Sequence, residues 1–257
     1  MAMTVLGNGL YLAEHYEDAL SVQEAQLSMY RRLGASENDI LVSQTNLANT
    51  YHALGRLEQA LQLERDVYYE SLRLLGEEDD DTLISANNYA NTLNELKRYQ
   101  EARAVLRKTM PVARRVHGDS IEITLRMRRY DAHALYRNEG ATLDDLREAV
   151  TTLEETTRTA RRVLGGAHPT TVGIEDELRD AGAVLRSRET PLRFKVGDRV
   201  KCCGGPNHWE SGTVIKLWWW QGFYAPYQVE LDEGRLIFAP EDSDRCIRRE
   251  VAPEGDA

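Results

Sequence analysis

The sequence predicts a mainly α-helical protein, in which an α-solenoid is followed by a small β-barrel. Three observations support this: a repeat of 42 residues, apolar residues at helical spacing inside each repeat, and a change of composition near residue 190. Glycines that close helix-like runs recur at Gly34, Gly76 and Gly118, and Gly165 follows 47 residues later. Repeats of roughly 20–50 residues are typical of solenoids, propellers and arrays, and the helical composition favours a solenoid.

Each repeat is predicted to contain two helices, and a shared motif marks the second one. The motif reads Tyr16-Glu17-Asp18-Ala19, Leu57-Glu58-Gln59-Ala60, Tyr99-Gln100-Glu101-Ala102 and Leu146-Arg147-Glu148-Ala149. Apolar residues on one face predict helices over 41–54, 57–75, 83–96 and 99–116, with turns at 55–56, 97–98 and 137–143. Small alanines at a fixed phase would let the two helices of a unit approach closely.

All four tryptophans and all three phenylalanines lie after residue 190, and Pro191 stops an incoming helix. We therefore place helical repeats at 1–188, a barrel at 191–250 and a disordered tail at 251–257. Short β-branched and aromatic runs predict strands at 194–202, with a Gly-Asp turn inside it, and at 211–218, 227–231, 235–238 and 244–248, with a tight hairpin turn at 232–234. Five short strands favour a small barrel.

The composition is that of a soluble globular protein with a net charge of -10. No apolar run approaches the ~20 residues of a membrane span, and neither part has a strongly basic surface, so we expect no membrane or nucleic-acid partner. An odd count of three cysteines and the absence of a signal-like N-terminus lead us to expect a cytoplasmic protein.

We find no catalytic constellation, so we expect a non-enzyme without cofactor or metal. The six histidines are scattered without metal-ligand spacing, and no glycine-rich phosphate motif is present. Cys202, Cys203, His208 and Cys246 could be drawn as a zinc site. However, adjacent cysteines on a strand point to opposite faces.

Three segments resemble the tetratricopeptide repeat in its 42-residue form, which is typical of kinesin light chains. They are Asn46-Leu47-Ala48-Asn49-Thr50-Tyr51, Leu57-Glu58-Gln59-Ala60 and Leu164-Gly165-Gly166-Ala167-His168-Pro169-Thr170-Thr171. The resemblance covers about residues 1–188. It implies a solenoid of about four helix pairs and a capping helix, whose first helices line a concave, peptide-binding face.

Aligning the units gives three rows of candidate groove residues. The first row is Asn8, Asn49, Asn91 and His133; the second is Thr45, Asn87 and Arg129; the third is Tyr11, His52, Asn94 and Tyr136. An asparagine amide offers donors and an acceptor, so the first row would form a ladder along an extended peptide. The alternative is that these residues sit on a solvated helix face.

Basic residues crowd the third and fourth repeats: Arg103, Arg107, Lys108, Arg114, Arg115, Arg126, Arg128 and Arg129. A basic end on an acidic protein could attract an acidic peptide. The alternative is a solvated outer face on which these residues pair with nearby Glu and Asp.

The C-terminal phrases Val196-Gly197-Asp198-Arg199-Val200, Gly212-Thr213-Val214 and Tyr227-Gln228-Val229-Glu230-Leu231 resemble SH3-like barrels of the Tudor type. The longer string around Ala225-Pro226 and Ala239-Pro240 is similar to a module common in microalgal proteins. The Tudor resemblance implies an aromatic pocket for methylated Lys or Arg, for which the candidates are Trp209, Trp218, Trp220, Phe223 and Tyr224. The alternative is that these rings fill a small core.

These patterns favour an adaptor or scaffold that binds an extended segment of a protein partner in the groove of the repeats. Two alternatives remain open: a methyl-mark reader built on the barrel, and a regulatory subunit of a separate enzyme.

Overall fold

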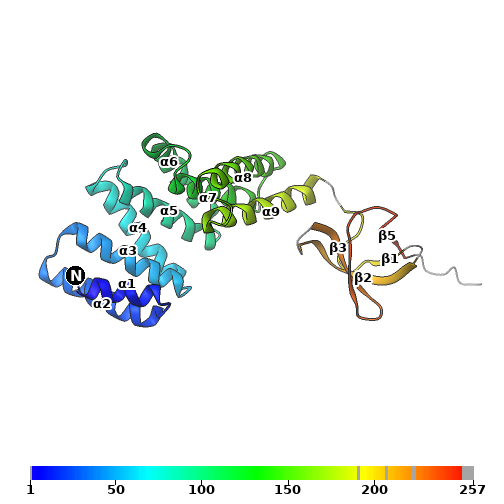
Figure 1. Ribbon diagram of the computed structural model, residues 1–257, viewed down its shortest axis with the longest axis horizontal. Coiled ribbons are helices and arrows are strands. Elements are labelled where there is room, and N and C mark those ends of the chain that lie inside the picture. Colours follow the sequence, from blue (N-terminus) through cyan, green and yellow to red (C-terminus); the bar gives the residue numbers. More distant parts are fainter. Residues whose placement is uncertain (1, 190–191, 206–207, 221–223, 251–257) are drawn as a thin grey trace, which may run out of the picture. The chain divides into compact units, whose positions relative to one another are not determined.

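The computed structural model describes residues 2–189, 192–205, 208–220 and 224–250, which form nine helices followed by five strands (Figure 1). The helices are α1 (Ala2–Leu12), α2 (Tyr16–Leu33), α3 (Glu37–Ala53), α4 (Leu57–Leu74), α5 (Asp80–Glu95), α6 (Tyr99–His117), α7 (Glu122–Arg137), α8 (Leu143–Val163) and α9 (Pro169–Glu189). The chain divides into two compact units, Met1–Ala181 and Gly182–Ala257. Within the described residues, no helix is both long and apolar enough to cross a membrane.

The helices of the first unit pack as successive pairs, α1–α2 to α7–α8, and α9 follows. The predicted turns at 55–56, 97–98 and 137–143 are confirmed, since each lies between the two helices of a pair. At the first of these turns Gly55 has a φ of 70°, and at the same phase of the next unit Lys97 has a φ of 60°. A left-handed conformation favours glycine, so Lys97 carries backbone strain that Gly55 avoids.

Local sequence also determines where the helices start. The hydroxyl of Ser36 accepts a hydrogen bond from the Asp39 backbone at the start of α3, and Asp79 caps α5. Thr142 and Asp145 form a reciprocal capping box at the start of α8. Such caps satisfy N–H groups that have no partner inside the helix.

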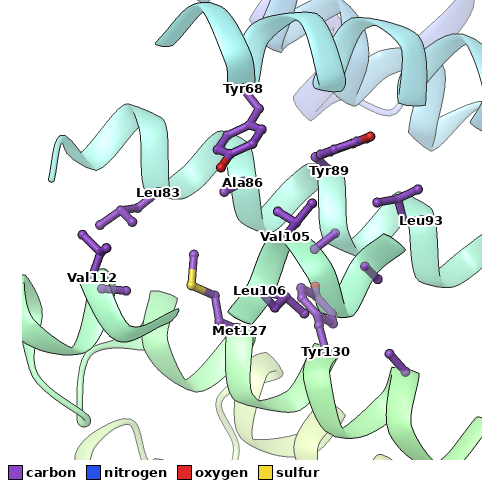
Figure 2. Close-up of a cluster of buried hydrophobic side chains, with 14 of the residues drawn as sticks. Tyr68, Leu83, Ala86, Tyr89, Leu93, Val105, Leu106, Val112, Met127 and Tyr130 are labelled. Carbon is purple, nitrogen blue, oxygen red and sulfur yellow. The ribbon is translucent and has the colours of Figure 1, made fainter. Parts of the chain in front are cut away.

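The core of the helical unit is centred on α5, α6 and α7 (Figure 2). Alanines at the predicted fixed phase are almost completely buried: Ala48, Ala60, Ala90, Ala102, Ala132 and Ala149. Ala90 and Ala102 belong to one cluster with the larger side chains of Leu106, Met127 and Tyr130. The small residues therefore let the helices approach closely, as expected from the repeat.

The second unit is an antiparallel sheet of β1 (Arg199–Gly205), β2 (His208–Trp220), β3 (Tyr224–Leu231), β4 (Leu236–Ala239) and β5 (Ile247–Arg249). The strand order is β4-β3-β2-β1-β5, and Val200, Val214, Tyr227 and Ile247 form its core. The predicted hairpin between β3 and β4 is confirmed: the Gly234 N–H donates to the Leu231 carbonyl at 2.8 Å.

Two predictions for this unit are wrong. The first strand begins at Arg199 rather than at Phe194, although the Gly-Asp turn expected inside this segment is present: Gly197 has a φ of 94° and the Asp198 N–H donates to the Lys195 carbonyl. Within the described residues the sheet is also not a closed barrel. Its edge strands β4 and β5 are only four and three residues long and do not pair with each other. Asp242 and Asp244 lie in the segment between β4 and β5, and each forms an ion pair with Arg193 at 2.6 Å.

Candidate functional site

The first row of candidate residues lies at accessible positions on successive first helices. Asn8 on α1 is exposed, and Asn49 on α3, Asn91 on α5 and His133 on α7 are partly exposed. In the other rows, Thr45, His52, Tyr11 and Arg129 are also partly exposed. These positions can be reached by a ligand.

Three other members of the rows are not accessible, which corrects the sequence-based assignment. Asn87 is 0% exposed, Asn94 is 4% exposed and Tyr136 is 3% exposed. The Asn94 amide nitrogen donates to the Tyr130 carbonyl of α7 at 2.9 Å. The backbones of α5 and α7 approach more closely than those of α3 and α5. The same phase is therefore covered in one unit and open in the unit before it.

A polar cluster joins α3 to α5. His52 Nε2 lies 2.9 Å from Glu95 Oε1, and the Asn91 amide donates to the same oxygen at 2.8 Å. The hydrogen bond to Glu95 raises the pKa of His52 despite its burial, and in turn lowers the pKa of Glu95. Because Glu95 accepts both bonds, it orients two of the candidate side chains.

A second polar cluster joins α7 to α9 around Glu177, a residue that the sequence analysis did not identify. Its carboxylate lies 2.9 Å from His133 Nδ1, accepts from Tyr136 Oη at 2.6 Å and lies 3.5 Å from Arg129. Burial acts to raise the pKa of Glu177, but hydrogen bonds from His133 and Tyr136 hold it below its usual range. The fourth-unit candidates are therefore already engaged by α9.

Glu64 on α4 is the second residue that sequence reasoning missed. It is 5% exposed, and its Oε2 has no hydrogen-bond partner within the described residues. The Thr92 hydroxyl on α5 lies close enough to act on the Glu64 carboxyl and to lower its pKa, although the effect of burial outweighs it. Burial raises the pKa of Glu64 to about 7. The repeat itself could have revealed Glu64, because the equivalent residue 42 positions later is Leu106. An acid therefore stands at a position where the next repeat has a leucine.

Two cavities follow the junction of α3, α4 and α5, which we call the α3–α5 seam. The larger has a volume of about 150 Å³ and is lined by apolar and polar residues that include Val42, Val67, Ile84 and Asp81. The smaller has about 10 Å³ and lies beside Thr45, Asn49, Glu64, Ser85 and Asn88. Thr45, Val67 and Ser85 line both cavities, so the two are adjacent along the seam.

Most of the basic residues in the third and fourth repeats are neutralised by ion pairs. The pairs are Arg103–Asp131, Arg114–Asp119, Arg115 with Glu77 and Glu78, Arg128–Glu155 and Arg129–Glu177. This arrangement fits the alternative of a solvated, paired surface better than a dedicated site for an acidic peptide.

The aromatic pocket of the second unit is described only at Trp209. The guanidinium of Arg248 lies 3.8 Å from the centre of a Trp209 ring, so the protein's own cation already covers that ring. Phe223 and the side chains of Trp218, Trp220 and Tyr224 lie outside the described residues. Cys202 is buried and Cys203 exposed, as expected for neighbours on a strand. The described residues contain no cluster of three or more potential metal ligands.

Comparison with known proteins identifies the repeats. Residues 40–81 and 82–120 each match the family model of the tetratricopeptide repeat. No curated protein matches the chain. The solved structure of a putative kinesin light chain from Podosopora anserina, with nearly identical TPR-like repeats, is similar, with a TM-score of 0.59 and 21% sequence identity over 73% of this chain and 87% of that chain.

A variant of the same fungal protein gives a TM-score of 0.61, again at 21% identity over the same shares of both chains. At this identity the likeness concerns the fold alone. Residues 40–120 are thus tetratricopeptide repeats, and the helical unit has a fold similar to that of kinesin-light-chain-like repeat proteins.

Proposed function

We propose that the protein is a non-catalytic adaptor that binds an extended segment of a protein partner along its first helices. The observation that carries this proposal is the row of Asn49, Asn91 and His133, three accessible hydrogen-bonding side chains at intervals of 42 residues. An extended chain advances about 3.3 Å per residue, so a single segment can pass several members of the row.

The chemistry of these side chains suits a peptide backbone. The Asn49 side chain makes no hydrogen bond within the described part of the chain, so its donors and its acceptor are available. Asn91 uses its nitrogen on Glu95, which leaves its carbonyl oxygen for a peptide N–H. His133 is held by Glu177, so its ring orientation is fixed before binding. Side chains held in place lose less entropy when a ligand binds.

A displayed library of random peptides of about twelve residues, which span roughly 40 Å when extended, tests this proposal. We expect the full-length protein to select peptides, and the double variant Asn49→Ala/Asn91→Ala to bind them at least about tenfold more weakly. The matched control is Gln62→Ala, an exposed amide on α4 that lies outside the row. Equal binding by the double variant and the wild type would contradict the proposal.

For the second unit we propose an SH3-like interaction module. The supporting observation is the order of its strands, in which β1 to β4 follow one another and β5 returns to pair with β1, with Lys201 opposite Arg248. Methyl-mark reading receives no support from the described residues, because Arg248 occupies the face of Trp209. Fluorescence titration of the full chain with trimethyl-lysine peptides checks this, and a saturable micromolar response would contradict it.

A further inference from the structure

The α3–α5 seam differs from the seam one repeat later, where α5 and α7 meet over α6. At that α5–α7 seam, Leu106, Met127 and Tyr130 are buried in one apolar cluster (Figure 2). The residues 42 positions earlier are Glu64, Ser85 and Asn88. Two small polar side chains and a carboxyl thus replace three large ones. Glu64, Ser85 and Asn88 all line the smaller cavity, and Ser85 also lines the larger one.

The burial of Glu64 is costly unless something compensates for it. Its Oε2 has lost its hydration and accepts no hydrogen bond within the described residues, and the Thr92 hydroxyl offsets only part of this cost. Leucine at the same phase of α6 shows that the fold does not need an acid here. A buried acid with one unpartnered oxygen beside a cavity therefore points to a ligand that carries a donor or a positive charge.

We propose that the α3–α5 seam binds a lysine side chain of the partner segment. This proposal rests on the peptide-binding function above and specifies its ligand. The methylene stem would lie in the larger cavity against Val42, Val67 and Ile84, and the ammonium group would reach Glu64 through the smaller one. Lysine side chains commonly pack their stems on apolar surface in this way.

Size and charge both favour lysine over other side chains. A cavity of about 10 Å³ holds one water-sized group, which an ammonium matches and a planar guanidinium exceeds. Among the described residues, Asp81 is the only charged one that lines the larger cavity, and Glu64 is the only charged one that lines the smaller. A cationic side chain is therefore attracted, and an acidic one is repelled.

The surroundings of Glu64 predict how binding depends on pH. The titratable groups near its carboxyl are His52 on α3 and Glu95 on α5. Burial holds the pKa of Glu64 at about 7 in the free protein, so an ammonium ligand must displace the proton below that pH. Affinity for a lysine peptide should therefore rise as the pH increases through 7, and it should level off above it.

The experiment selects random displayed peptides on the full-length wild type and re-synthesises the best binder with single replacements at each lysine. We expect one lysine whose change to arginine, norleucine or glutamate weakens binding at least about tenfold. Glu64→Gln should cause a similar loss and abolish the pH dependence. The control Glu58→Gln removes an exposed acid from the same helix outside the seam, and it should bind like the wild type.

A second variant, Glu64→Leu/Ser85→Met/Asn88→Tyr, fills the seam with the residues of the next repeat. We expect it to remain folded by circular dichroism and to lose binding of the lysine peptide. Peptides that bind through Asn49 and Asn91 without a preferred lysine, or unchanged affinity in Glu64→Gln, would show that the cavity holds only solvent. That result overturns the lysine subsite and leaves the adaptor proposal standing, whereas a failure to select any peptide overturns both.

Discussion

The α3–α5 and α5–α7 seams occupy the same phase of successive repeats, yet two cavities lie along the first, whereas large apolar side chains fill the second. The backbone elements and turns correspond at 42-residue spacing, but α5 and α7 approach more closely than α3 and α5, and the side chains between the helices differ. Leu106, Met127 and Tyr130 fill the later seam, where their counterparts are Glu64, Ser85 and Asn88. The repeat therefore fixes the order of helices and turns, while the spacing of the helices and the side chains between them decide whether a seam is filled.

The α7–α9 junction is a third arrangement, polar like the first but fully partnered. Glu177 accepts hydrogen bonds there from two side chains of α7, whereas the Oε2 of Glu64 accepts none within the described residues. A buried carboxyl can thus either tie two helices together or remain poised for a ligand. Which of the two it does depends on whether donors lie within hydrogen-bond distance.

The packed seam should be the most sensitive to truncation. Leu106→Ala removes a side chain that is 0% exposed, so we expect a loss of about 2–5 kcal/mol in the free energy of unfolding. Urea denaturation followed by circular dichroism measures the loss. Arg107→Ala, at the exposed neighbouring position, should change stability by no more than about 0.5 kcal/mol. A loss below that level at Leu106 would break the contrast between the seams.

In the α3–α5 seam, replacement of the buried acid should increase the free energy of unfolding rather than decrease it. The folded state keeps Glu64 protonated up to about pH 7, whereas the unfolded chain releases this proton near 4.5. Stability of the wild type therefore falls as pH rises between these values. Glu64→Leu should raise the free energy of unfolding by on the order of 2–3 kcal/mol at about pH 8, and by much less at about pH 4.

Thermal denaturation of the wild type and of Glu64→Leu across this pH range tests whether the substitution is stabilising and whether the gain grows with pH. A gain that does not depend on pH would mean that Glu64 is not protonated in the folded state. Glu58→Leu is the matched control for the loss of an exposed acid on the same helix.

The partnered junction should show the reverse pH trend. Its hydrogen bonds hold the pKa of Glu177 below the usual range, so its contribution is present at neutral pH and is lost as pH falls through the lowered pKa. Glu177→Gln should cost roughly 1–3 kcal/mol at neutral pH. The two proteins should converge in stability under acidic conditions. A constant difference from neutral to acidic pH would contradict this role.

The smallest effect is expected at the turn that links the two helices of the third unit. Lys97→Gly relieves a left-handed φ that Gly55 adopts without strain one repeat earlier. We expect a gain of about 0.5–1 kcal/mol, while Lys97→Ala should give none. Differential scanning calorimetry of both variants distinguishes relief of backbone strain from removal of the lysine charge.

The sequence by itself determined the helical pairs, their turns and the buried alanines. These features follow from local rules: the spacing of apolar residues, the motif around Ala60 and Ala102, and chain reversal at Gly55. Asn49, Asn91 and His133, which share one helical phase that recurs every 42 residues, are all partly exposed. The β3–β4 hairpin was equally predictable from its short turn.

Only the tertiary structure decided which residues of a shared phase are buried. Asn87 and Asn94 lie in the same rows as Thr45 and His52, but the close approach of α5 and α7 covers them. The importance of Glu64 and Glu177 was likewise hidden, since their environments are built by helices distant in sequence. The sheet is open, because its edge strands β4 and β5 are short and do not pair with each other. The alternation of apolar and polar residues within each strand does not reveal this. Burial and closure are set by distances between elements, and a local pattern carries no information about those distances.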